Sequence, residues 1–322
     1  MNTSRMVAAA GPHIHSNNSI QRMMRNLILA LIPVSLVGVY LYEMQAVRII
    51  ALTVCAAVLW ELVLQKIFKR KIAVHDLSAV AGGLMLALML PPNLPWWMIM
   101  LGAFLMIFLG KEIFGGLGCN PFNGVLIAWV ALKISYPAAM ENWPLPDRDM
   151  FADLPALDIL RYDGVYMTRE FYSLGTLFVG LDVIGPVGET SKLALLAGGI
   201  WLILTRTIFW HIPAAMFTGM LVFSSIFWLI DDHTYASPLF HLLAGGTFLA
   251  AFFLATDFSS SPVTKPGMIA FGLFAGVLTV IIRTWSQWTE GVYFAVFMAS
   301  LLTPLMDKIR PPAFGKKKSL FS

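Results

Sequence analysis

Residues 27–43 read LILALIPVSLVGVYLYE, and residues 46–65 continue with a second apolar run. A helix that crosses the hydrocarbon core of a bilayer needs about 20 predominantly apolar residues. The same character extends outward over the whole chain of 322 residues, of which 58% are hydrophobic and 12% are charged. Soluble domains carry about 25% charged residues, so this composition excludes a soluble globular protein. The high apolar content and the net charge of +4 also exclude a disordered chain.

The apolar runs are continuous, whereas the strands of a membrane β-barrel alternate apolar and polar residues. Backbone groups in hydrocarbon must be satisfied within the structure, which leaves helices for continuous runs. We therefore expect an all-α, polytopic membrane protein with about ten transmembrane helices. The segments lie near residues 27–43, 46–65, 77–91, 95–113, 121–137, 190–208, 212–230, 238–255, 266–284 and 291–306.

The basic residues lie mainly at the ends of these runs and predict the orientation of the chain, because cytoplasmic loops are enriched in Lys and Arg. With ten spans, both termini are cytoplasmic and the long connection 138–189 is external. Residues 1–26 are polar and carry no signal peptide. The pI of about 9.1 does not indicate nucleic-acid binding, because the basic residues are not spread over one binding face.

The two halves of the chain resemble each other. An Ala-Gly-Gly string occurs at 81–83 and again at 244–246, and Gly124 and Pro137 have the same separation as Gly291 and Pro304. Five spans per half is an odd number, so the second half is inverted relative to the first; chance matches among glycine-rich helices are the alternative. We predict a cytoplasmic segment (1–26), a five-helix repeat (27–137), an external loop (138–189), a second five-helix repeat (190–306) and a basic cytoplasmic tail (307–322).

A glycine-rich connection spans residues 110–123, GKEIFGGLGCNPFN. Glycines let a backbone approach a flat ligand closely, and asparagine both donates and accepts hydrogen bonds, as the edge of a ring system requires. The alternative is a tight re-entrant turn with no ligand. The candidate ligand-binding residues in this stretch are Lys111, Gly115, Gly116, Asn120 and Asn123.

Two further polar stretches interrupt the second half. Asp257 ends an apolar run at 255–257 and is a candidate for contact with an ion or a cofactor, because an acidic residue there is costly unless it is paired or hydrated. A plain helix end with a hydroxyl-capped turn explains it equally well. The string 188–191, which contains Thr190, is typical of a helix start.

Other reactive residues are sparse. Glu61 lies inside a span, and an ionisable residue there is a functional candidate. Asp307 follows the last span and either serves ion passage or pairs with a nearby base. Cys55 and Cys119 form no CxxC motif, so the chain cannot ligate an iron–sulfur cluster alone, and the histidines show no metal-ligand spacing. No catalytic residue and no metal ligand is assigned.

Taken together, five strings occur in the order and spacing of a known family: residues 12–16, 110–116, 120–123, 188–191 and 255–257. The chain resembles the family that contains the D subunit of Rnf electron-transport complexes and the B subunit of sodium-translocating NADH:quinone reductases. It lacks the long N-terminal extension of the latter and is closer to the Rnf form. The resemblance implies an enzyme subunit in the cytoplasmic (inner) membrane of a bacterium or archaeon, within a complex that exchanges electrons between ferredoxin and NAD coupled to movement of Na⁺ or H⁺.

The resemblance also implies flavin. The family carries FMN as a phosphoester on a threonine of the external loop, within a Ser/Thr-Gly-Ala-Thr string, and the quinone-reductase relative holds a second, noncovalent flavin in its membrane part. This chain has no such string. Thr168 is the best candidate for attachment and Thr176 the second; FMN bound without a covalent link is the alternative. The second flavin would be riboflavin or FMN, with Thr190 and Asp257 among the candidate contacts.

By analogy with the quinone-reductase relative, Glu61 and Asp307 are candidates for the ion pathway. The implied partners are the lipid bilayer and the other Rnf subunits, namely membrane iron–sulfur subunits, an external flavin subunit and cytoplasmic subunits that face NADH and ferredoxin. Two other functions fit the same sequence. A small-solute channel would have a continuous polar pore and no coloured cofactor, and a scaffold subunit would have lost its flavin.

Overall fold

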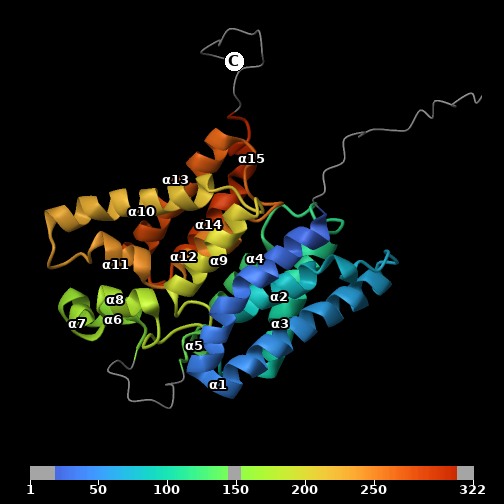
Figure 1. Ribbon diagram of the computed structural model, residues 1–322, viewed down its shortest axis with the longest axis horizontal. Helices are drawn as coiled ribbons and strands as arrows, with labels where there is room; N and C mark the ends of the chain where they lie inside the picture. Colours follow the sequence, from blue (N-terminus) through green and yellow to red (C-terminus); the bar gives the residue numbers. More distant parts are fainter. Residues whose placement is uncertain (1–18, 144–153, 310–322) are drawn as a thin grey trace, which may run out of the picture.

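The computed structural model describes residues 19–143 and 154–309, and every regular element in these ranges is a helix (Figure 1). The string 12–16 and most of the basic tail lie outside the described residues. The helices are α1 (Ile20–Ile67), η1 (Val74–Asp76), α2 (Ser78–Met89), α3 (Trp96–Ile107), η2 (Phe108–Glu112), α4 (Gly124–Ser135), α5 (Pro137–Met140), α6 (Ala156–Tyr162), α7 (Gly164–Phe171), α8 (Leu174–Val179), α9 (Lys192–Leu204), α10 (His211–Ile230), α11 (Pro238–Leu243), α12 (Thr247–Leu249), η3 (Ala250–Leu254), α13 (Lys265–Trp285), α14 (Val292–Leu301) and α15 (Thr303–Met306).

The first element is a helical pair rather than one rod. Ser19 caps its start by accepting a hydrogen bond from the Arg22 N–H at 3.1 Å. At Glu43 the backbone leaves the helical region, with φ of 49° and ψ of −127°. The chain reverses there, and the two arms run back along each other (Figure 1). The arms coincide with the first two apolar segments expected from the sequence.

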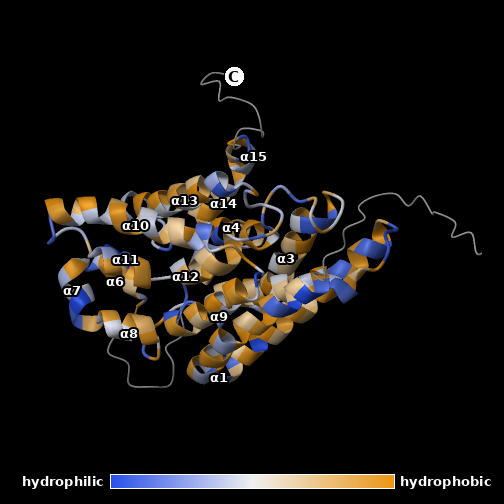
Figure 2. Ribbon diagram, turned by 45° about the horizontal axis from the view of Figure 1, so that its top comes forward, coloured by the Kyte–Doolittle hydropathy of each residue, from blue (hydrophilic) through white to orange (hydrophobic). Residues whose placement is uncertain are grey.

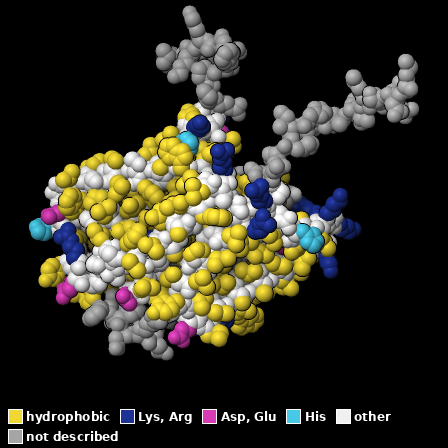
Figure 3. Space-filling view, in the orientation of Figure 1, with side chains coloured by type: hydrophobic (Ala, Val, Ile, Leu, Met, Phe, Trp, Pro, Cys, Tyr) yellow, Lys and Arg dark blue, Asp and Glu magenta, His cyan; other side chains and the backbone are white. Residues whose placement is uncertain are grey.

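The helices have the composition of membrane spans. Among the described residues, α1, α10 and α13 are long and apolar enough to cross a membrane, and α2, α4, α9 and α14 are shorter apolar helices. Hydrophobic residues occupy most of the helical ribbon (Figure 2). Their side chains cover much of the face drawn in Figure 3, and Leu36, for example, is 63% exposed. Such a surface is stable against lipid chains but not against water. The all-helical, apolar architecture is confirmed, and the number of ten spans stays a prediction.

Several helices are interrupted, which positions backbone groups inside the molecule. The region that we expected to form one span at 238–255 consists of α11, a break at 244–246, α12 and the π-helix η3. A second π-helix, η2, ends α3. Such π-helical turns are rare and occur frequently at functional sites. Both of them line or adjoin the cavity described below.

The long connection 138–189 is folded over its described residues 154–189. Its helices α6, α7 and α8 pack with α11 in a small apolar cluster of their own, in which Leu177 is fully buried. The long helices share one continuous apolar core. The external position of this connection stays a prediction.

Charges are distributed unevenly over the molecule. On the face drawn in Figure 3, most Lys and Arg side chains gather at the end that holds the start of α1 and the helix α15. Most Asp and Glu side chains on this face lie at the opposite end, towards α7 and the turn of α1. The uneven distribution is of the kind from which the orientation was predicted, and the side of the membrane on which the basic end lies stays a prediction.

Candidate functional site

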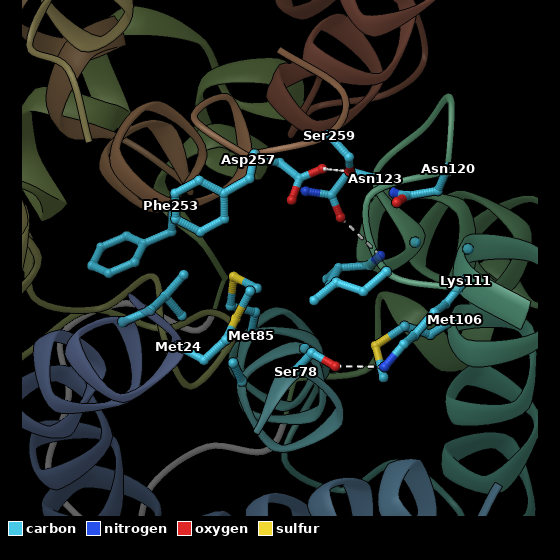
Figure 4. A pocket seen from close by; sticks show the side chains of 18 of the residues that line it. Met24, Ser78, Met85, Met106, Lys111, Asn120, Asn123, Phe253, Asp257 and Ser259 are labelled. Carbon is cyan, nitrogen blue, oxygen red and sulfur yellow. Dashed lines mark hydrogen bonds between the residues drawn. The ribbon is translucent and has the colours of Figure 1, made fainter. Parts of the chain in front are cut away.

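A cavity opens between the two halves of the chain at the basic end of the molecule. It lies between α1, α2, the η2–α4 connection and the end of η3 (Figure 4). It brings together four predicted ligand-binding residues, Lys111, Asn120, Asn123 and Asp257, from segments far apart in the sequence. The remaining lining residues include Met24, Leu27, Ser78, Gly82, Met85, Met106, Gly110, Gly124, Phe253, Thr256 and Ser259.

The cavity has an apolar wall and a polar edge. Met24 of α1, Met85 of α2 and Phe253 of η3 form the apolar side, and Asn120, Asn123, Asp257 and Ser259 gather on the other side (Figure 4). Methionine is flexible and polarisable, so it adapts to the face of a flat ring. The arrangement therefore suits a planar ligand with an apolar face and a hydrogen-bonding rim.

Lys111 connects the cavity to a buried group of charges. It belongs to the π-helix η2, where the widened turn directs its side chain towards α1 and α2. Its ammonium forms an ion pair with Glu61 and donates to Ser78 Oγ at 2.6 Å, and it lies 3.4 Å from Asp76 Oδ2. Glu61 is fully buried, and its Oε2 atom has no hydrogen-bond partner among the described residues. A buried carboxylate with a vacant oxygen can accept a further donor or a cation.

Around this pair lie residues that the sequence reasoning missed. Gln65 donates from Nε2 to Glu61 Oε1 at 3.1 Å and to Glu112 Oε1 at 3.3 Å, and Arg70 forms a 3.1 Å salt bridge with Glu112. Gln65 follows Glu61 by four positions, so both side chains lie on one helix face. That spacing was visible in the sequence and could have identified Gln65.

The two asparagines hold the polar edge in place. Asn123 is the N-cap of α4: its Oδ1 accepts from Val125 N at 2.9 Å, and its Nδ2 donates to Leu254 O at 3.2 Å. It therefore ties the first half of the chain to the end of η3 in the second half. Asn120 donates to Phe122 O at 2.7 Å, which shapes the loop before α4.

Asp257 lies at the end of the same edge. Its Oδ2 accepts from Ser259 Oγ at 3.0 Å and from Ser260 Oγ at 2.8 Å. The hydroxyl-rich sequence after Asp257 therefore forms a local turn that orients the carboxylate. The capped turn expected from the sequence is present, and it also places Asp257 in the cavity wall. Contact of Asp257 with an ion or a cofactor stays a prediction.

Close contact between two glycines closes the back of the cavity. A Cβ added at Gly110 would overlap the Cα of Gly124, so the end of α3 and the start of α4 touch backbone to backbone. Gly115 and Gly116 adopt φ values of 115° and 111°, which favour glycine, but they form the loop beyond the cavity and do not line it.

Three predicted site residues lie away from this cavity. Thr190 is fully buried just before α9, with its hydroxyl directed at Val187 O. Thr168 lies on α7, is 2% exposed, and donates from Oγ1 to Gly164 O at 2.8 Å. Thr176 is half-buried in the first turn of α8, 2.8 Å from Ser173 Oγ.

The two candidates for the ion pathway are also separated. Glu61 lies beside Lys111 as described, whereas Asp307 follows α15 and its Oδ1 accepts from Val263 N at 2.9 Å. Asp307 therefore joins the C-terminal end of the described chain to the loop that follows Asp257.

The residues of the cavity fit the chemistry of a flavin ring. Lys111 supplies charge, the amides of Asn120 and Asn123 supply hydrogen bonds at the rim, and Met24, Met85 and Phe253 supply an apolar face. Glu61 does not line the cavity; it pairs with Lys111 behind the wall. The free volume is about 90 Å³, smaller than ligand cavities usually are. A flavin ring would therefore enter only if the two methionines or the glycine-rich connection moved aside.

Comparison with known proteins agrees with the motifs. A model of the NQR2, RnfD, RnfE family matches residues 7–315. The D subunit of the Na(+)-translocating ferredoxin:NAD(+) oxidoreductase complex of Acetobacterium woodii is 37% identical over 310 residues, which covers 96% of this chain and 94% of that protein. The D subunit of the ion-translocating oxidoreductase complex of Escherichia fergusonii is 33% identical over 347 residues, and that of Pseudomonas aeruginosa is 34% identical over 330 residues; each alignment covers 96% of this chain, with 98% and 95% of the relative. With a match over nearly its whole length, the chain belongs to the NQR2, RnfD, RnfE family.

Proposed function

We propose that this chain is the flavin-carrying membrane subunit of an Rnf-type complex, which passes electrons between ferredoxin and NAD and couples this to translocation of Na⁺ or H⁺. The names of the relatives supply the reaction. The cavity at the basic end supplies the site. The other subunits of such a complex and the lipid bilayer are its partners, and the termini lie on the cytoplasmic side of the membrane.

The finer architecture is ten spans in two inverted repeats of five. Helix packing supports this: α1 packs on α9 and α4 on α14, which pairs the first and the fifth element of each half across the molecule. Within the halves, the contact between α3 and α4 corresponds to the contact between α13 and α14. In inverted-repeat membrane proteins, sites lie where interrupted helices of the two halves meet.

A noncovalent flavin, riboflavin or FMN, occupies the cavity. Flavin exchanges one or two electrons and so connects one-electron carriers with two-electron donors. Asn120, Asn123 and Asp257 would hold the polar rim of such a ring, and Met24, Met85 and Phe253 would contact its apolar face. Lys111 supplies positive charge beside the ring, and the protein tunes such a cofactor through nearby charge.

Covalent attachment of a second FMN remains a separate proposal. The Thr168 hydroxyl donates into its own helix and is buried, so attachment there requires α7 to turn it outward. Thr176 is more accessible but is held by Ser173. Peptide mass spectrometry over residues 162–192, searched for an added FMN, decides between the two threonines and no attachment.

One observation carries the proposal: Lys111, Asn120, Asn123 and Asp257, chosen from the sequence as ligand contacts, line one cavity with an apolar wall. The test is acid extraction of loosely bound flavin from the purified complex containing Asn120→Ala. This substitution removes a rim amide and leaves the α4 cap intact, so we expect loss of noncovalent flavin with the subunit still assembled. Asn142→Ala, the same substitution in an exposed loop, is the control and retains flavin.

Two outcomes contradict the proposal. If complexes with Asn120→Ala and Asn142→Ala contain equal amounts of noncovalent flavin, the ring does not bind at this edge. If the unaltered subunit releases no flavin on acid extraction and shows no ultraviolet fluorescence after denaturation, the scaffold function is correct.

A further inference from the structure

A second group of buried charges lies at the opposite, external end, where the break between α11 and α12 meets the starts of α9 and α14. Its central members are Glu189, at 4% exposure, and Glu290, whose side chain is 15% exposed. Neither residue was selected from the sequence as a ligand. The group lies away from the flavin cavity and shares no residue with its lining.

Two adjacent glycines at the helix break make room for the two carboxylates. A Cβ at Gly245 would overlap the Glu290 carboxylate, and a Cβ at Gly246 would overlap the Tyr293 hydroxyl and approach Glu189 Oε1. The Gly246 N–H donates to Glu290 Oε1 at 2.7 Å, and the Tyr293 hydroxyl donates to Glu189 Oε1 at 2.5 Å. Both carboxylates are therefore held against the same short stretch of backbone.

The two carboxylates converge on Gly246: its N–H donates to Glu290 Oε1, and a Cβ added to it would lie 3.0 Å from Glu189 Oε1. An ionised carboxylate only accepts hydrogen bonds, so two neighbouring carboxylates can share a hydrogen bond only when one of them carries a proton. Two carboxylates that share a buried site behave in this way generally, because placing two negative charges side by side in a medium of low polarity is unfavourable.

Basic side chains balance the remaining charge. Arg283 donates to His241 O at 2.6 Å and Ala244 O at 3.1 Å, which satisfies the open end of α11, and it lies 3.4 Å from Glu290 Oε1. Lys192 is fully buried, and within the described ranges its ammonium contacts the carbonyls of Glu189 and Thr190 rather than a carboxylate. The charged and titratable groups near the pair are Lys192 of α9, Arg283 of α13, Tyr293 of α14 and Tyr42 of α1. Across the adjoining cavity lie Asp158 of α6 and the ion pair between Lys133 of α4 and Glu141.

A small cavity connects the pair to the side of the molecule that carries the 138–189 connection. It has a volume of about 40 Å³, large enough for water, and is lined by Glu189, Glu290 and Asp158. Burial raises the pKa of Asp158, which lies in that connection, above its ordinary value.

We propose that Glu189 and Glu290 form a proton-binding site that exchanges one proton with the external aqueous phase through the Asp158 cavity. On uptake, a proton from water binds one carboxylate oxygen and is shared with the other carboxylate; on release it returns to water. Arg283 stays charged throughout and balances the negative charge that the protonated pair retains. The site works independently of the flavin.

The test is infrared difference spectroscopy of the purified complex after a pH step, at a fixed redox state and in both H₂O and D₂O. We expect a protonated-carboxyl band that shifts on deuteration and is lost in both Glu189→Gln and Glu290→Gln. Glu170→Gln, the same substitution on the exposed face of α7, retains the band and is the control. The complex with Asn120→Ala also retains it, which separates this test from that of the flavin site.

Three results overturn the proposal. The first is a band that persists in either Glu→Gln variant. The second is loss of the band from the unaltered complex when Na⁺ is added at constant pH, which would identify Na⁺ as the occupant. If the Glu→Gln subunits do not assemble, Tyr293→Phe replaces them in the test, because it removes one hydroxyl and keeps the ring. The frequency of the carboxyl band should then shift, since Tyr293 no longer donates to Glu189. An unchanged band frequency is the third contradicting result.

Discussion

The ion pair between Lys111 and Glu61 makes the most direct prediction about the cavity at the basic end of the molecule. Replacing Lys111 by Met keeps a long flexible side chain but removes the positive charge from a carboxylate that is fully buried and already has one unpaired oxygen. Breaking a buried pair by removing one partner costs about 3–5 kcal/mol, because a buried charge remains uncompensated. Gln65 still donates to Glu61 and offsets part of this cost, so we expect a loss near 3 kcal/mol.

The assay is thermal unfolding of the full-length chain in detergent, followed by loss of helical circular dichroism. Because the entropy of unfolding grows with chain length, a loss of this size lowers the midpoint by about 4–5 °C for a chain of 322 residues. Lys66→Met is the matched control, since Lys66 is exposed in the last turn of α1 and such surface substitutions change stability by less than about 0.5 kcal/mol.

The double variant Lys111→Met with Glu61→Gln tests the cause. With both charges removed, no unpaired buried charge remains, and the amide introduced by Glu61→Gln can still contact Gln65. We therefore expect the double variant to be at least about 1–2 kcal/mol more stable than the sum of the single effects predicts. The reasoning is refuted if the two effects add without coupling, or if Lys111→Met unfolds at the same temperature as Lys66→Met.

The glycine contacts and the external loop make three further predictions. Gly110→Ala forces the backbones at Gly110 and Gly124 apart, because the added Cβ would overlap Gly124. Thermal unfolding should show a loss of stability of about 1–3 kcal/mol or more, and acid extraction should show less bound flavin. An unchanged flavin content would contradict the shape of the cavity. Gly180→Ala should loosen the 154–189 segment, because Gly180 has φ of 78° and an added Cβ would overlap Thr190 O. Limited proteolysis should then cut this segment faster. An unchanged cleavage rate would count against the close contact between Gly180 and Thr190. Burial raises the pKa of Asp158 above its ordinary 3.8, so the folded form binds its proton more tightly than the unfolded form. The free energy of unfolding therefore falls as pH rises from 3.8 through the raised value. Asp158→Asn should remove this component of the pH dependence of the unfolding midpoint, and an identical profile in the variant would refute it.

The architecture was largely predictable because it depends on local composition. Continuous apolar runs must be helical in lipid, and this requirement acts on each segment separately. The helices α10 and α13 accordingly lie where residues 212–230 and 266–284 predicted them. The break at 244–246 was visible in the sequence as an Ala-Gly-Gly string. The sequence did not show that the carboxylates of Glu189 and Glu290 pack against its two glycines.

The candidate site was predictable only in its polar stretches. Asp257 stood out because an acidic residue at the end of an apolar run is costly unless it is paired or hydrated. Lys111, Asn120 and Asn123 stood out because they lie in a glycine-rich connection between two apolar runs. Thr190 was selected from the string 188–191, yet the structure places it away from the cavity. Sequence order alone does not say at which end of a helix bundle a loop lies once helices are short, broken or reversed.

By itself, therefore, the sequence determined that this chain is an apolar helical membrane protein of the NQR2, RnfD, RnfE family, because composition and motifs are properties of contiguous residues. The tertiary structure decided which charges are neighbours: Glu61 with Lys111 at one end, and Glu189 with Glu290 at the other. Such pairings join distant segments, and they are settled by how helices pack and where glycines let backbones approach, which no local pattern encodes.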